Sequence, residues 1–150
     1  MTAAPTMTDQ EAANLEATKR YFIRGDAGRP DTFDLFTDDV QIYFPKFGVT
    51  HGKDGFRELA TGLLGSVSAI AHDLSTFSYV VTGDTVVVEG TTYGTGAENR
   101  TWRGGQSPGG RFCSVFKFRD GLIARMHIYL DPDYVSQDSA RFLWGLERSW

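Results

Sequence analysis

Two pairs of strand-like segments, each joined by a short glycine-containing turn, constrain the fold of this chain more than any other feature. Each segment alternates or is rich in β-branched and aromatic residues, and a Gly-Asp or Asp-Gly step between two such segments is a strong hairpin signal. The pairs are residues 72–81 with 85–93, around Thr82-Gly83-Asp84, and residues 111–118 with 122–130, around Arg119-Asp120-Gly121. We therefore predict four antiparallel strands in the second half of the chain.

The first half predicts helices instead. Thr8 and Glu11 have the spacing of a capping box, so a helix over residues 9–24 is expected, with Gly25 ending it. Pro30 suits the first turn of a second, shorter helix. A short strand over residues 40–44 and a third helix complete this half. The third helix rests on apolar residues at helical spacing, namely Phe56, Leu59, Ala60 and Leu63.

Helices grouped before strands indicate an α+β fold in a single domain, which the 150 residues also favour. We expect residues 1–8 to be a disordered N-terminus, residues 9–135 to be the domain, and the tail 136–150 to be helical. Between the two hairpins, the glycine-rich segment 94–110 is predicted to be a long mobile loop. Aromatic residues make up 13% of the chain, which a strongly curved sheet covered by helices would explain.

Composition excludes several classes of protein. The net charge is −4 without a basic cluster, which argues against nucleic-acid binding. No apolar stretch is long enough for a transmembrane helix, and residues 1–8 lack the apolar region of a secretory signal. Cys113 is the only cysteine, so neither a disulfide framework nor a cysteine zinc site is expected. The three histidines do not have metal-ligand spacing, and we predict a cytoplasmic protein without a metal.

Several short motifs, taken in their order and spacing, resemble the nuclear transport factor 2-like superfamily, in its SnoaL-like and ketosteroid-isomerase-like branch. The similarity covers residues 9–135, nearly the whole chain. The motifs are Leu35-Phe36-Thr37-Asp38-Asp39-Val40, Phe44-Pro45, His51-Gly52-Lys53-Asp54-Gly55-Phe56, Gly83-Asp84-Thr85-Val86, Phe116-Lys117-Phe118-Arg119-Asp120-Gly121 and Tyr129-Leu130-Asp131-Pro132.

The resemblance implies a cone-shaped, curved antiparallel sheet, closed by three N-terminal helices around an apolar cavity. It also implies a homodimer formed through the outer face of the sheet. The expected ligand is a small apolar compound, polyketide- or steroid-like, and the expected chemistry is cofactor-free isomerisation, cyclisation or dehydration. The fold does not imply one activity, because it also hosts non-catalytic binding proteins.

Residues at the family's catalytic positions argue against two of its mechanisms. The steroid isomerases place a carboxylate base before the proline of the first strand, where this chain has Phe44. Their oxyanion-hole acid corresponds to Ser114, and their tyrosine corresponds to Thr18, with Tyr21 one turn later. The epoxide hydrolases of this fold use an aspartate on the last strand, where this chain has Ile128.

The dehydratases of this fold offer a partial match. They carry a histidine near the start of the second strand, which corresponds to His72, and imidazole is suited to acid–base work near neutral pH. Ser114 could add a hydrogen bond, and Tyr21 or Tyr43 a phenol. The second histidine of those enzymes is missing, and the segment offers Glu89, Tyr93 and Trp102 instead. His72, Ser114 and Tyr21 are therefore the predicted catalytic residues, and the alternative for His72 is a histidine bonded to backbone or solvent.

The two-residue period of strands predicts which side chains face the interior. His127 and Tyr129 are expected to point outward, as is Cys113, and Glu89 is expected to be a surface charge because Val86 and Val88 would point inward. Trp102 either covers the mouth of the cone or anchors its loop. The predicted pocket-lining residues are Thr18, Phe44, Trp102, Phe112, Phe116, Met126 and Ile128.

The sequence leaves three hypotheses about function open. The first is an enzyme that transfers a proton within a small apolar substrate. The second is a non-catalytic binding module that uses the same pocket, which the apolar residues Phe44 and Ile128 favour. The third is a dimerisation domain whose interior is filled by aromatic side chains.

Overall fold

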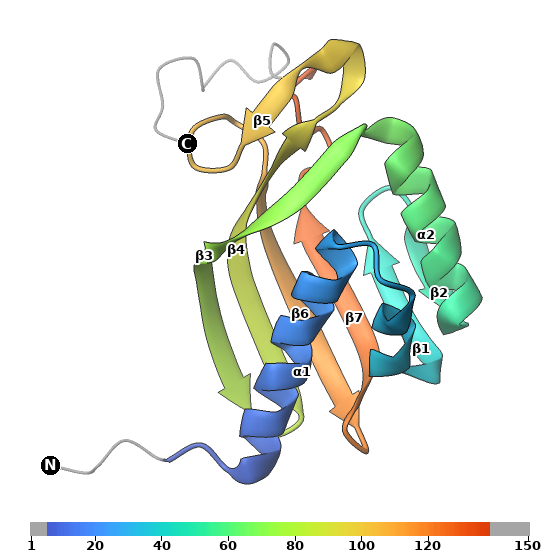
Figure 1. Ribbon diagram of the computed structural model, residues 1–150, viewed down its shortest axis with the longest axis vertical. Coiled ribbons are helices and arrows are strands. Elements are labelled where there is room, and N and C mark those ends of the chain that lie inside the picture. Colours follow the sequence, from blue (N-terminus) through green and yellow to red (C-terminus); the bar gives the residue numbers. More distant parts are fainter. Residues whose placement is uncertain (1–5, 139–150) are drawn as a thin grey trace, which may run out of the picture.

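The computed structural model describes residues 6–138 and has the α+β architecture that the sequence predicts (Figure 1). Residues 1–5 and 139–150 lie outside the described part, and with them most of the predicted disordered N-terminus and of the predicted helical tail. Of the described start of this tail, residue 136 has no regular structure and residues 137–138 form a turn. The helices are α1 (Asp9–Asp26), η1 (Pro30–Leu35), α2 (Gly52–Ser66) and η2 (Ala97–Asn99), and the strands are β1 (Phe36–Phe44), β2 (Gly48–His51), β3 (Ala69–Thr82), β4 (Thr85–Thr95), β5 (Thr101–Arg103), β6 (Arg111–Arg119) and β7 (Leu122–Leu130).

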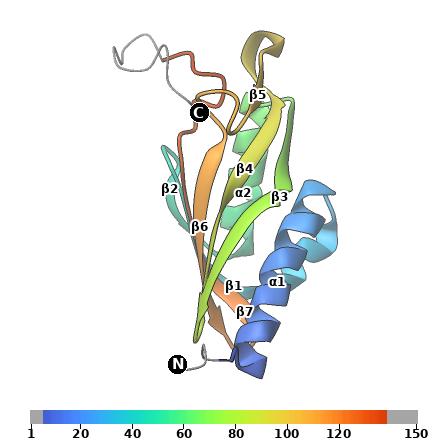
Figure 2. The same cartoon turned by 90° about the vertical axis from the view of Figure 1, so that its left-hand side faces the viewer.

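The strands form one curved sheet in the order β2-β1-β7-β6-β4-β3, and β5 pairs with β4. Both predicted hairpins, β3–β4 and β6–β7, are present and antiparallel. The β1–β7 pair is parallel, unlike the antiparallel arrangement expected throughout. A parallel pair requires a long connection between its strands, and here α2 and five strands of the sheet separate β1 from β7 along the chain. Helices α1 and α2 lie on the same face of the sheet (Figure 2).

The start of α1 follows the predicted capping box. The Thr8 side chain accepts a hydrogen bond from the Glu11 backbone N–H (3.2 Å), and the Glu11 carboxylate accepts one from the Thr8 N–H (2.8 Å). Glu11 also accepts the Gly83 backbone N–H (2.8 Å), which ties the helix start to the β3–β4 turn. These hydrogen bonds to backbone N–H groups lower the pKa of Glu11. Glu11 therefore both completes the helix cap with Thr8 and attaches the helix start to the sheet through Gly83.

Replacing Thr8 by alanine is expected to lower the free energy of unfolding by about 1 kcal/mol, because one N-terminal backbone donor of α1 loses its acceptor. Urea unfolding followed by circular dichroism measures this change.

The Glu11 carboxylate has a lower pKa in the folded state, so its contribution to the stability of the fold is present above its unfolded pKa and is lost as the pH falls through the folded pKa. The difference between wild type and Glu11→Gln should thus shrink on acidification, and a pH-independent difference would contradict this role.

Several boundaries differ from the sequence expectation. Helix α1 continues through Gly25 to Asp26, and the chain turns instead at Gly28, whose φ is +63°. The helix begun by Pro30 is a 3-10 helix. Strand β1 begins at Phe36 rather than at residue 40.

The predicted loop 94–110 contains the short strand β5, so it is more ordered in backbone pairing than expected. Trp102 on β5 is 3% exposed and donates its indole N–H to the Thr92 hydroxyl (3.0 Å). Its ring stacks on Tyr134 with 4.6 Å between centroids. Of the two roles considered for Trp102, these contacts match the anchor of its loop.

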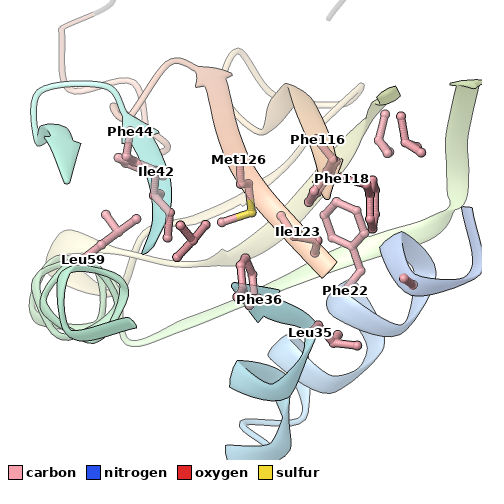
Figure 3. Close-up of a cluster of buried hydrophobic side chains, with 14 of the residues drawn as sticks. Phe22, Leu35, Phe36, Ile42, Phe44, Leu59, Phe116, Phe118, Ile123 and Met126 are labelled. Atoms are coloured by element: carbon pink, nitrogen blue, oxygen red, sulfur yellow. The ribbon is translucent and has the colours of Figure 1, made fainter. Parts of the chain in front are cut away.

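The main hydrophobic core lies between the sheet and the helices that cover it (Figure 3). Val86 and Val88 of β4 are fully buried and Glu89 is exposed, which confirms the predicted orientation of that strand. On β7, a register shift lets both Ile123 and Met126 be fully buried although they are three residues apart. Beyond this shift, Tyr129 is exposed as predicted.

Among residues 6–138, no helix is both long and apolar enough to span a bilayer.

Candidate active site

A histidine–carboxylate pair joins the end of α1 to β3. The His72 Nδ1 atom lies 2.7 Å from Oδ1 of Asp26, and the His72 backbone N–H donates to Oδ2 of the same carboxylate (2.8 Å). The two residues are 46 positions apart in the sequence. Because one carboxylate accepts both groups, the position and the ring orientation of His72 are fixed together.

Three phenylalanine rings surround the His72 imidazole. Phe22, Phe112 and Phe77 contact it edge-to-face, at centroid distances of 4.8, 5.2 and 6.1 Å. The His72 and Asp26 side chains nevertheless each retain 23% of their exposure. The pair therefore sits at the margin of the aromatic core, where a small molecule could reach it.

The pair determines which imidazole nitrogen is available for chemistry. A carboxylate next to Nδ1 makes Nδ1 the protonated nitrogen of neutral imidazole, so Nε2 is the free acceptor. Nε2 has no hydrogen-bond partner within residues 6–138. The arrangement can accept a proton at Nε2 and stabilise the imidazolium that results.

Tyr21, one of the predicted catalytic residues, lies in the aromatic core close to the same pair. Its ring contacts Phe22 (4.9 Å), Phe116 (5.5 Å) and Phe36 (5.7 Å) edge-to-face. Burial raises the pKa of Tyr21, and the nearby negative charge of Asp26 raises it further. Its hydroxyl makes no hydrogen bond to any residue of the described part. Tyr21 is thus a neutral phenol that can donate a hydrogen bond.

Ser114, the second predicted helper, sits on the inward face of β6 between Phe112 and Phe116 and is 2% exposed. Its hydroxyl has no hydrogen-bond partner in the described range. Thr18, by contrast, uses its hydroxyl within α1, since it donates to the Asn14 carbonyl (3.0 Å). Of the two, Ser114 is the one whose hydroxyl is uncommitted.

The predicted pocket-lining residues divide into two groups. Most belong to the main core near α1 and α2, where Ile128 is half-buried and the others are buried: Thr18, Phe44, Phe112, Phe116, Met126 and Ile128. Trp102 belongs to a second cluster with Val67 and Tyr134. Leu63 and Leu130 pack against both clusters and connect them.

The outer face of the sheet carries several residues considered for the site. Tyr43 contacts His127 and Tyr129 there, at ring distances of 5.7 and 5.6 Å, and so it does not join His72. The His127 Nε2 atom lies 2.9 Å from the Gln41 side-chain oxygen. Burial, followed by the charge of Arg125, lowers the pKa of His127. These neighbours give His127 a place in a surface cluster.

A cavity of about 630 Å³ lies on the β3–β4–β5 ladder and includes Ala71, Tyr93 and Arg103 in its lining. These three residues are in register across the ladder. They face away from His72, because adjacent residues of β3 point to opposite faces. The lining of this cavity therefore does not include the His72–Asp26 pair.

Asp26 is the functional candidate that the sequence analysis missed. It follows Gly25, which was expected to end the helix, and no local pattern distinguishes it from other surface carboxylates. Only the packing of the C-terminal end of α1 against β3 brings it to His72.

Comparison with known proteins shows which family the chain resembles. The model of a SnoaL-like domain family matches residues 18–126. No curated protein matches the chain.

Many solved structures are similar, all at low identity in the examples that follow. TerC co-crystallised with polyporic acid is 20% identical with a TM-score of 0.69, over 79% of this chain and 92% of that one. A putative SnoaL-like polyketide cyclase from Jannaschia sp. CCS1 is 16% identical with a TM-score of 0.71, over 85% and 92%. An NTF2-like protein from Anabaena variabilis is 21% identical with a TM-score of 0.70, over 87% and 98%.

At this level of identity the structures establish the fold only. The family match covers well over half of the chain and agrees with the motifs, the order of elements and the curved sheet. The chain belongs to the SnoaL-like domain family, and its fold is similar to that of NTF2-like proteins.

Proposed function

We propose that this protein binds a small, mostly apolar organic molecule beside the His72–Asp26 pair and catalyses a cofactor-free proton transfer within it. The reaction would be an isomerisation, a cyclisation or a dehydration. His72 Nε2 removes a proton from the substrate, and the imidazolium returns it to another atom of the substrate, so no net proton or electron is consumed. Asp26 holds His72 in the tautomer that this cycle needs.

The observation that carries the proposal is the double contact of one carboxylate with His72, at 2.7 and 2.8 Å. The two contacts tie the end of α1 to β3 across 46 residues of sequence and hold the imidazole in one orientation. Phe77, which is half-buried beside His72, offers apolar contact area for a substrate. TerC, a protein of this fold, was crystallised with the small molecule polyporic acid, which supports ligand binding as the general role.

Tyr21 and Ser114 are proposed to orient the substrate. Each has a hydroxyl without a hydrogen-bond partner in the described residues, and both belong to elements that line the aromatic core. Because burial keeps Tyr21 protonated, its phenol can donate to a carbonyl oxygen that gains negative charge during proton transfer. This arrangement favours carbonyl compounds among the possible substrates.

A second candidate function is binding without turnover. It is favoured by Phe44 and Ile128, which stand where other enzymes of this fold have carboxylates. On this view the His72–Asp26 pair would recognise a polar group of the ligand instead of moving a proton.

Native mass spectrometry of the freshly purified protein, compared with its denatured spectrum, tests ligand binding directly. We expect a bound small molecule, whose mass then guides an assay of turnover. A protein that carries no ligand and binds none from a library of aromatic and polyketide-like carbonyl compounds would contradict the proposal. The predicted cytoplasmic location rests on sequence composition and stays a prediction.

We further propose that two copies associate through the outer face of the sheet. Val80 of β3 is 61% exposed and Tyr129 of β7 is 47% exposed on that face, while their neighbours Tyr79 and Val81, and Ile128 and Leu130, pack against the core. Exposed apolar groups on one sheet face are typical of an interface.

Replacing Val80 by aspartate is expected to raise the dissociation constant of this dimer by roughly a hundredfold or more, because it places two unpaired charges in an apolar contact. Light scattering after size-exclusion chromatography measures the change. Leu64→Asp is the matched control, since Leu64 is 65% exposed but lies on α2. A protein that is monomeric at all concentrations would refute the dimer.

A further inference from the structure

Tyr134 is a buried phenol that the proposed chemistry of His72 does not use. It follows β7, its side chain is 5% exposed, and its ring stacks on Trp102 with 4.6 Å between centroids. Its hydroxyl makes no hydrogen bond to any residue from 6 to 138. Because a buried hydroxyl without a partner costs free energy, the position of Tyr134 favours a partner that the described chain does not supply.

Tyr134 lines an apolar cavity of about 330 Å³ between α2 and the β1–β2 turn, which we call the α2 cavity. Phe44 and Leu59 of its lining belong to the main core (Figure 3). Lys46 and Ser66 also line it, but both are exposed to solvent. Tyr134 is therefore the buried polar side chain of this cavity.

The inner face of the sheet connects Tyr134 to the site at His72. Leu130 packs against the cluster that contains Tyr134, and it is in register with Phe112, whose ring contacts His72 at 5.2 Å. Ile70 packs against the same cluster and lies two residues before His72, on the same face of β3. Leu130 and Ile70 face inward but are only partly buried, which leaves apolar surface for a ligand between the two places.

Tyr21 and Tyr134 lie within electrostatic reach of each other. Burial raises the pKa of Tyr21 most, the charge of Asp26 raises it further, and the Tyr134 phenol adds to this effect. Burial also raises the pKa of Tyr134. Both phenols are therefore neutral at physiological pH, and each can donate a hydrogen bond.

From these contacts we infer that the pocket binds a substrate with two separated oxygen atoms, one held by Tyr21 and Ser114 beside His72 and the other by the Tyr134 hydroxyl at the α2 cavity. This inference rests on the proposed function. It narrows the substrate from apolar carbonyl compounds to those that carry a second oxygen acceptor at the far end. Tyr134 then determines specificity, because a ligand without that oxygen leaves a buried hydroxyl unpaired.

Two aromatic ketones of nearly equal size test the second oxygen. Methoxytetralone and ethyltetralone, each substituted on the benzene ring para to its ketone, differ only in an ether oxygen that replaces a methylene group. Isothermal titration calorimetry of the wild-type protein should show roughly tenfold tighter binding of methoxytetralone. Equal dissociation constants would overturn the inference and leave the proposed function in place, whereas a protein that binds neither ketone would contradict both.

Tyr134→Phe removes the hydroxyl but keeps the ring that stacks on Trp102, so its midpoint of urea unfolding should equal that of wild type. This variant should bind the two tetralones with equal affinity. Tyr43→Phe is the matched control, because Tyr43 contacts His127 and Tyr129 on the outer face of the sheet, and it should keep the wild-type preference. A preference for methoxytetralone that persists in Tyr134→Phe would overturn the inference.

Two glycines of α2 test whether the second oxygen lies at the α2 cavity. Gly62 lines this cavity and Gly65 does not, and a Cβ atom at either position meets no atom within 4 Å. We expect Gly62→Phe to weaken the binding of methoxytetralone, because the added ring narrows the cavity, and Gly65→Phe to bind it as wild type does. Equal binding by the two variants would overturn this placement of the ligand.

Discussion

Replacement of His72 by alanine is expected to lower the rate of turnover by roughly 10²–10⁴-fold, the usual contribution of a positioned general acid–base group. Binding of the ligand should change little, because the substitution removes the proton acceptor and leaves in place the phenylalanine rings packed beside it, Phe22, Phe77 and Phe112. The measurement is product formation from the compound found by native mass spectrometry, together with its dissociation constant for each variant.

Two further variants make this experiment specific. Asp26→Asn keeps the size of the side chain but removes the charge that favours the Nε2-acceptor tautomer, so turnover should also fall while binding persists. His51→Ala is the matched control, because His51 precedes α2 and its side chain makes no cap hydrogen bond. Turnover by His72→Ala at the wild-type rate would remove His72 from the mechanism, and unchanged turnover by Asp26→Asn would remove the positioning role of Asp26.

Replacement of Phe22 by alanine is expected to lower the free energy of unfolding by about 3–5 kcal/mol. Phe22 is 2% exposed, and its ring contacts the rings of Tyr21, His72, Phe77 and others at 4.8 to 5.8 Å. The loss includes both the transfer of the ring and a cavity at the centre of the aromatic cluster. For a domain whose total stability is about 5–15 kcal/mol, this is a large fraction.

Urea unfolding monitored by circular dichroism measures this effect, with Phe47→Ala as the control because Phe47 is 38% exposed. Phe22→Leu should be much milder, because leucine refills most of the space. The same series also probes the site, since Phe22 packs directly on His72. If Phe22→Ala were no more destabilising than Phe47→Ala, the aromatic cluster would not be the centre of the core.

Most of the secondary structure could be predicted because it depends on neighbours in the sequence. Thr8 and Glu11 begin α1 through hydrogen bonds that span three residues, and the turns at Gly83 and Gly121 join strands that are adjacent in the chain. The orientation of β4 followed from simple alternation. The register shift in β7 escaped prediction, because an extra residue in a strand costs little locally and is decided by the partner strand.

The candidate site could be predicted only in part. His72, Tyr21 and Ser114 were singled out through resemblance to a family, and their roles stay predictions. Asp26 was missed because its significance comes from a contact across 46 residues, and Tyr43 lies on the other face of the sheet from His72. The glycine-rich segment 94–110 looked like a loop because the pairing of β5 with β4 leaves little pattern in three residues.

The sequence by itself determined the order of helices and strands, the two hairpins and which side chains of β4 face the core, because the periods of helix and strand are properties of the backbone. Only the tertiary structure decided that β1 lies parallel to β7, that Trp102 stacks on Tyr134 and that Asp26 holds His72. These contacts join segments far apart in the chain. Their free energy comes from burial and hydrogen bonding between surfaces that exist only once the elements have packed.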